Sequence, residues 1–191
     1  MRMRAIVFSA VLALSAPGIA MAQAMNPTGS DEQRQQMADL SFLDGEWRGE
    51  ATIYNRDGSR TTLTQTERVG PFLGGSIRVV EGRGYDAAGE TVFNAMAVIS
   101  WDEREDRYRF RSWANGHDGD FRFERTETGF VWEVPAGPGA VVRYTATVQD
   151  GVWHEAGAYV GEGSPHMPTM EMTLRRIGDS DWPAAGAVAR Q

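Results

Sequence analysis

Residues 107–113 read Arg-Tyr-Arg-Phe-Arg-Ser-Trp, and this alternation of charged and aromatic side chains decides the fold class. Successive side chains of a β-strand point to opposite faces of the sheet. The three arginines therefore share one face, while Tyr108 and Phe110 share the other. The segment is expected to be a strand with one charged and one apolar face.

The same two-residue period continues along most of the chain. Turn signals such as Asp57-Gly58, Asn115-Gly116 and Asp150-Gly151 separate runs rich in Val, Thr, Phe, Tyr and Trp. Counting these runs predicts about ten strands, near residues 45–55, 60–69, 76–84, 91–101, 107–114, 120–125, 129–134, 140–149, 152–160 and 168–177. The apolar face is expected to include Phe121, Phe123, Phe130, Trp132, Val134, Val142, Tyr144, Ala146, Met170, Met172 and Leu174.

Short connections between these runs favour antiparallel hairpins joined in sequence. Closing such a meander into a barrel buries the apolar face and removes the sheet edges. The sequence therefore predicts an all-β protein, a single antiparallel up-and-down β-barrel with a short N-terminal helix capping one end. Ser30 and Gln33 have the spacing of a capping box at the start of that helix. An open β-sandwich is the alternative fold for the same pattern.

The first residues resemble an export signal. Arg2 and Arg4 precede an apolar stretch over residues 5–16, and Ala20-Met21-Ala22 provides a small-x-small cleavage pattern. A retained anchor helix is the alternative, but the stretch is short for a membrane span. We expect a signal peptide over 1–22, a leader and short helix over 23–39, a barrel over 40–177 and a flexible C-terminal tail over 178–191. The expected location is the bacterial periplasm or the medium.

Composition excludes several partner and site classes. The 191-residue chain has a formal net charge of −7, which argues against nucleic acid and anionic membranes as partners. It has no cysteine, so it offers no disulfide, no thiolate nucleophile and no thiolate metal ligand. The three histidines lie in three separate segments without a metal-ligand spacing. We expect no membrane anchor and no metal; the sequence leaves the oligomeric state open.

The start of the first predicted strand carries a motif, Leu40-Ser-Phe-Leu-Asp-Gly45-Glu-Trp47-Arg-Gly49. Its Gly-x-Trp resembles the entry motif of the calycin, or lipocalin-like, superfamily. The resemblance implies a Trp47 buried at the closed end of the barrel, with an arginine of the last strand across its ring. Alternation favours Arg176 over Arg175 for that role, because Arg176 shares the face of Leu174.

Further motifs resemble a bacterial secreted family of unknown function within that superfamily. They are Gly84-Tyr85-Asp86, Trp153-His-Glu155 and Glu171-Met-Thr-Leu-Arg-Arg176, so the likeness covers residues 40–177. The opening also resembles nitrobindin-type haem-binding barrels. The proximal histidine of those barrels lies near the end of the sequence, and no histidine follows His166 here. No cofactor is therefore expected, and haem is disfavoured.

Polar residues on predicted inward faces are the candidate ligand contacts. Gln65 and Glu67 share a face with Leu63, Glu81 shares one with Val79, and Asn94 shares one with Met96. Such groups inside a barrel usually contact water, a ligand or a reacting group, although a register shifted by one residue would place them in solvent. His154 is expected to point inward as a core or ligand-orienting residue. The full candidate set is Gln65, Glu67, Glu81, Asn94, Tyr108, Trp132, Tyr144 and His154, with Gly45, Trp47 and Arg176 closing the barrel.

The sequence favours a binding or carrier barrel for a small hydrophobic molecule. Motifs for a serine nucleophile, a P-loop, a dinucleotide or a zinc protease are missing, so no catalytic residue is assigned. Two alternatives stay open: an isomerase or hydrolase that uses an interior Glu and His154, and a barrel filled by aromatic side chains that serves a structural role.

Overall fold

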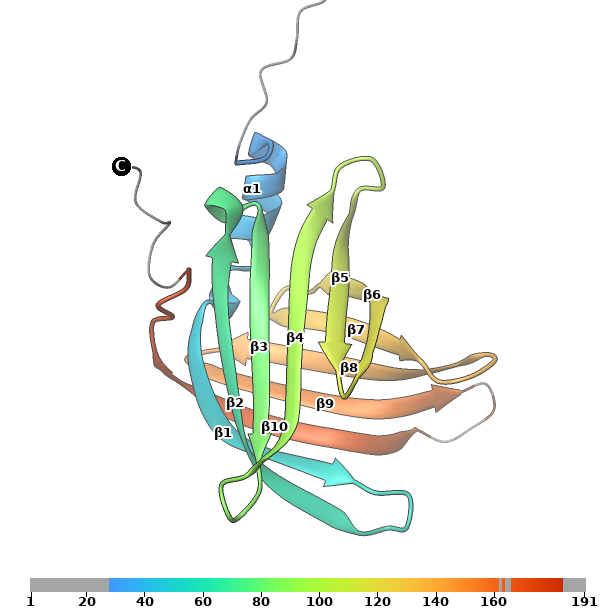
Figure 1. The fold of residues 1–191 in the computed structure, drawn as a ribbon. Helices are drawn as coiled ribbons and strands as arrows, with labels where there is room; N and C mark the ends of the chain where they lie inside the picture. The colour runs from blue at the N-terminus through green and yellow to red at the C-terminus, as the bar shows by residue number, and fades with distance from the viewer. Residues whose placement is uncertain (1–27, 162, 164–165, 184–191) are drawn as a thin grey trace, which may run out of the picture.

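The computed structural model describes residues 28–161, 163 and 166–183 and is a closed antiparallel barrel (Figure 1). Each strand pairs with the next one along the chain, and β10 returns to pair with β1. The predicted fold class is thereby confirmed, and the open sandwich is not formed. The strands are β1 Gly45–Tyr54, β2 Arg60–Phe72, β3 Ile77–Tyr85, β4 Thr91–Asp102, β5 Arg107–Ala114, β6 His117–Arg125, β7 Gly129–Pro135, β8 Ala140–Gln149, β9 Val152–Gly161 and β10 Met167–Gly178.

Some strand boundaries differ from the prediction for identifiable local reasons. β6 begins at His117, three residues before the predicted start, because Asn115 and Gly116 both adopt positive φ (53° and 80°) and complete the turn in two residues. β2 continues past Val69 to Phe72. Beyond β10, residues 179–183 include Trp182, whose ring lies 5.6 Å from that of Phe72. This part of the expected tail therefore packs against β2.

Helix α1 (Asp31–Ala38) and the short helix η1 (Ser41–Leu43) cover one end of the barrel. Met37, Leu40 and Leu43 are fully buried there, which explains why a helix with few apolar residues holds its position. The predicted capping box is confirmed: the Gln33 amide donates to Ser30 Oγ (3.0 Å), and the Ser30 amide donates to Gln33 Oε1 (3.1 Å). The helix is thus placed as predicted, across the barrel end.

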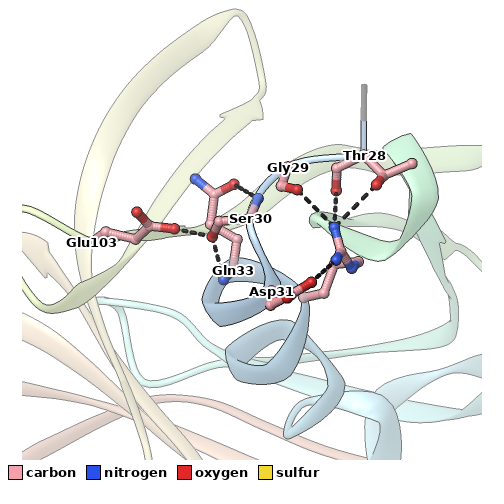
Figure 2. A network of polar contacts seen from close by, with 7 residues as sticks. Thr28, Gly29, Ser30, Asp31, Gln33 and Glu103 are labelled. Atoms are coloured by element: carbon pink, nitrogen blue, oxygen red, sulfur yellow. Dashed lines mark hydrogen bonds and ion pairs between the residues drawn. The ribbon is translucent and has the colours of Figure 1, made fainter. Parts of the chain in front are cut away.

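A polar network fixes the start of α1 against the barrel, as Figure 2 shows. Ser30 also contacts the carboxylate of Glu103 in the β4–β5 turn. The Arg34 guanidinium donates to the carbonyl oxygens of Thr28 (3.2 Å) and Gly29 (2.7 Å). Farther along, Tyr108 Oη donates to the carbonyl of Gln36 (2.9 Å). These contacts tie the helix to the end that carries the β2–β3 and β4–β5 turns, leaving five hairpins at the opposite end.

The outer face is charged, as the alternation predicted. The Arg111 guanidinium pairs with Asp118 and Asp120 of the next strand, and Arg143 pairs with Glu133. Among the helices in the described part of the chain, none has the length and apolarity needed to cross a bilayer. The expected signal peptide over 1–22, the first residues of the leader and residues 184–191 lie outside the described residues.

Candidate functional site

The barrel encloses a cavity of about 630 Å³, to which all ten strands contribute side chains. At the closed end of the barrel, Leu43 of η1 lines the cavity. At the opposite end, Asn115, His117 and Asp118 of the β5–β6 hairpin line it. The predicted alternative of a filled barrel is therefore wrong. The space exists because the β3–β4–β5 wall carries small inward residues: Gly82, Ala95 and Ala114 lie side by side in register.

The facing wall is aromatic. Trp132 and Tyr144 stack with ring centroids 4.1 Å apart and an angle of 11° between their planes. Phe110 packs against both Phe123 (5.5 Å) and Trp132 (5.2 Å). Because each ring is held by another, this wall is a rigid apolar surface with Trp132 at its centre.

One buried carboxylate interrupts this wall. Glu155 of β9 is only 5% exposed, and its two oxygens accept hydrogen bonds from Trp132 Nε1 (2.9 Å) and Trp153 Nε1 (3.1 Å). Burial raises the pKa of Glu155, while the two indole donors favour the charged form and partly oppose that rise. The two tryptophans thus orient the carboxyl group at the cavity surface.

A second carboxyl group enters from β2. Glu67 Oε1 accepts a hydrogen bond from Gln65 Nε2 (2.8 Å), and both side chains line the cavity. The carboxyl group lies over Gly82 of β3, where a Cβ atom would come within 2.6 Å of Glu67 Oε1 and would require the carboxyl group to move. Burial raises the pKa of Glu67 to about 8 with a smaller contribution from the negative charges of Glu155 and Glu81, while the hydrogen bond from Gln65 partly opposes the rise. Glu67 is therefore mostly protonated at neutral pH.

Four of the eight candidate ligand contacts line the cavity: Gln65, Glu67, Trp132 and Tyr144. Tyr108 is also inside the barrel, but its hydroxyl bonds to α1 at the closed end and does not reach the cavity. The sequence pattern gave its face correctly and carried no information about its depth along the barrel.

The predicted inward orientation is wrong for Glu81, Asn94 and His154. The partners of Gln65 and Glu67 on β3 are Gly84 and Gly82, so the inward row of β3 is even-numbered and Glu81 faces outward beside Arg83. Asn94, opposite Arg83, likewise faces outward. His154 is exposed, with its Nε2 3.3 Å from Glu171 Oε1.

The neighbours of His154 are the site residues that the sequence analysis missed. Trp153 and Glu155 point inward, opposite Leu174 and Met172 of β10. The sequence did contain a signal for this orientation. β10, the neighbour of β9, alternates clearly between apolar and polar residues. On β9, the large aromatic Trp153 suits the barrel interior better than the smaller Val152 and Ala156 on the opposite face. The acid–base pair considered between an interior glutamate and His154 is not formed.

The residues predicted to close the barrel meet at its floor. Trp47 is 2% exposed, donates from Nε1 to the Leu43 carbonyl (2.9 Å) and packs edge-on against Trp153 (5.7 Å). Arg176 is directly opposite Trp47 in the β1–β10 register, and its Nε donates to the Asp44 carbonyl (3.2 Å). Gly45 has a φ of 135° and lies against that guanidinium. A Cβ atom at this position would come within 2.7 Å of Arg176 Nε.

The geometry at the floor differs in part from the resemblance. The cation–π contacts found in the described residues do not include Arg176 over the Trp47 ring. Instead, Arg176 bridges β10 to the chain before β1 and pairs with Asp179. A second arginine, Arg78 of β3, is 4% exposed and forms a two-pronged ion pair with Asp44 (2.8 and 2.9 Å). The closed end therefore has two arginines converging on Asp44.

Among solved structures, the chain is similar to the crystal structure of Rv2717c from M. tuberculosis, with a TM-score of 0.56 and 10% sequence identity. The match covers 74% of this chain and 96% of that chain. No protein-family model matches the sequence, and no curated protein matches it either. At this identity the likeness is one of fold alone: the chain is a ten-stranded antiparallel β-barrel similar to that mycobacterial barrel.

Proposed function

We propose that this protein binds a small, largely apolar molecule inside its barrel. The observation that carries the proposal is the cavity of about 630 Å³, which falls in the size range of small-molecule sites. Its lining combines apolar and aromatic side chains with a smaller number of polar groups, among them Gln65, Glu67 and Glu155. Such a site takes an apolar body and orients it by one polar contact.

The further parts of the proposal concern family and location. We assign the chain to the calycin superfamily, supported by the Gly45-x-Trp47 entry and the buried Trp47 at the closed end. We also propose export to the bacterial periplasm or medium, supported by the signal-like residues 1–22. N-terminal sequencing of the protein secreted by its own host should begin at Gln23; a chain that still begins at Met1 would contradict export by cleavage.

Haem does not fit the donor set of the cavity. An axial haem ligand is usually a histidine. His154 lies on the outer face and His166 is exposed, and neither lines the cavity. His117 lines only the hairpin rim, where it is exposed. The expectation that the barrel works without a cofactor stays a prediction.

The proposed function is tested by filling the cavity. Ala95 has small neighbours on both sides, so Ala95→Phe projects a ring into the open space. Val98→Phe adds the same ring to the outer face of the same strand and is the matched control, because Val98 is opposite Arg111. An environment-sensitive apolar dye should bind the natural protein and Val98→Phe alike and lose most of its affinity for Ala95→Phe.

Equal dye binding by all three proteins would place the dye outside the cavity and contradict the proposal. Native mass spectrometry of protein purified from its own host gives an independent reading. We expect an added small-molecule mass that Ala95→Phe lacks and Val98→Phe retains.

A further inference from the structure

The ionisable side chains that line the cavity are acidic, except for His117 at the rim. In the described part of the chain, no arginine lines the cavity, and His117 at the rim is the only basic side chain that does. The arginines instead lie on the outer face and at the closed end, where they pair with carboxylates such as Asp120 and Asp44. Apart from His117 at the rim, the described side chains that line the cavity are thus acidic or neutral.

Glu155 is the strongest sign of a missing partner. Its side chain is 5% exposed, and among the ion pairs of the described residues none involves Glu155 or Glu67. A buried carboxylate without a cation is costly, since desolvation is not repaid by Coulomb attraction. Two indole donors give Glu155 one hydrogen bond for each oxygen, and a carboxylate can accept about four.

The neighbouring surface also suits a cation. Trp132 donates to Glu155 from Nε1, at the edge of its ring, and stacks on Tyr144, so both aromatic side chains line the cavity that the carboxylate also lines. Aromatic ring faces attract cations, and the attraction grows where water is excluded. The second carboxyl group, Glu67, is held over Gly82 by Gln65 and lines the same cavity as Glu155.

We infer that the ligand is an amine with an apolar body, bound as its ammonium ion by Glu67 and Glu155 beside the Trp132–Tyr144 stack. The inference rests on the proposed function, because it needs an occupied cavity. An ammonium group supplies up to three donors, which match the free acceptor positions of the two carboxylates. The apolar body then lies along the small residues of β3 and β4.

Binding of the ammonium ion should release a proton. The free protein holds Glu67 mostly protonated at pH 7, because burial and the charges of Glu155 and Glu81 raise its pKa. A cation at the site favours the ionised form, so Glu67 loses its proton to the buffer as the amine enters. Calorimetric titration at pH 7 in phosphate and in Tris should therefore give binding enthalpies that differ by nearly the difference in buffer protonation enthalpy.

The direct test uses three ligands with the same eight-carbon chain: octylamine, 1-octanol and octanoate. At pH 7 we expect octylamine to bind about tenfold to a hundredfold more tightly than octanol, since hydrogen bonds to a charged group contribute about 1.5–3 kcal/mol and 1.4 kcal/mol is tenfold. Octanoate should bind more weakly than octanol. Intrinsic fluorescence is a suitable signal because Trp132 lines the cavity.

Variants separate the inference from the proposed function. Glu67→Gln should reduce the preference for octylamine over octanol to less than about threefold while octanol binding persists. Glu124→Gln removes a carboxylate of the outer face and should leave the preference unchanged. Glu155→Gln should act like Glu67→Gln, and if it does not fold, Glu67→Gln carries the test.

Equal affinity for octylamine and octanol in the natural protein would overturn the amine inference and leave the proposed function standing. A preference that survives in Glu67→Gln would also overturn it. If none of the three ligands and no apolar dye binds, both the inference and the proposed function fail.

Discussion

The carboxyl group of Glu67 should make the stability of the barrel depend on pH. Its pKa rises from an ordinary value of 4.5 to about 8 in the folded protein, chiefly through burial, with Glu155 and Glu81 adding to the rise. Below pH 4.5 the group is protonated in both the folded and the unfolded chain. Between pH 4.5 and 8 only the folded chain keeps the proton, so the stabilisation present at low pH is lost as the pH rises, and above 8 the loss is complete.

The size of the effect follows from the pKa. A rise from 4.5 to about 8 corresponds to about 5 kcal/mol at 1.36 kcal/mol per pH unit. Because Glu67 borders an open cavity that admits water, we expect about half of this, roughly 2–3 kcal/mol. Glu67→Gln keeps the shape and cannot ionise, so the variant should gain stability relative to the natural protein by that amount between pH 5 and pH 9.

The assay is urea unfolding followed by tryptophan fluorescence at pH 5, 6, 7, 8 and 9 for both proteins. Taking the difference in unfolding free energy between the two proteins removes most of the pH-dependent contributions of the other titrating groups. Glu124→Gln, on the outer face, is the control and should show a difference that is nearly constant with pH. A difference for Glu67→Gln that changes by less than about 0.5 kcal/mol over this range, or that changes in the opposite direction, would refute the reasoning.

Three further predictions concern the closed end of the barrel. Trp47→Ala should lower the unfolding free energy by about 3–5 kcal/mol in chemical denaturation, as for a fully buried aromatic; a loss below about 1 kcal/mol would contradict its placement. Arg176→Ala should cost about 1–2 kcal/mol and Arg175→Ala less than about 0.5, because only Arg176 bonds to the chain before β1; equal, negligible losses in thermal melts would remove the closure role. Arg78→Ala should lower the unfolding free energy by about 1–3 kcal/mol, because it removes the buried guanidinium and leaves the half-buried carboxylate of Asp44 without this ion pair; Asp44→Asn combined with Arg78→Ala should lower it by less than the two single losses added together.

The strand pattern was predictable where one face is plainly apolar. On β7, β8 and β10 most inward residues are apolar and most outward ones polar, so alternation assigned Trp132, Tyr144 and Met172 to the correct face. The floor was predictable for a different reason. A Gly-x-Trp entry and an arginine in the inward row of the last strand fixed which ends of the chain meet.

The register of β3 was not predictable from its own residues. Its outward row holds the apolar Ile77 and Val79, while its inward row holds Arg78 and the glycines at 82 and 84. A glycine has no side chain, so its polarity does not indicate which face of the strand points inward. An arginine is usually exposed, so Arg78 would be assigned to the outer face unless its ion-pair partner were known. Asp44 is that partner, 34 residues earlier in the chain, and the pairing of β1 with β2 and of β2 with β3 brings the two together.

The cavity itself could not be read from the sequence. It depends on how side chains from ten strands fill the interior, and the row of Gly82, Ala95 and Ala114 forms only once three strands are in register. The acidic character of the site was half predicted. Glu67 was found through the alternation of β2, whereas Glu155 was missed because the face of β9 was assigned from His154.

The pairing of β1 with β10 has a consequence for synthesis on the ribosome. The strand that begins at Gly45 emerges early, but its second neighbour is the last strand, so one edge of β1 stays unpaired until Gly178 has been made. A nascent chain with an exposed apolar strand edge is prone to join a second copy. Contacts this distant in sequence also slow folding. Between the synthesis of β1 and that of β10, the unpaired edge of β1 is therefore the part of the nascent chain that a chaperone would need to shield from association with a second copy.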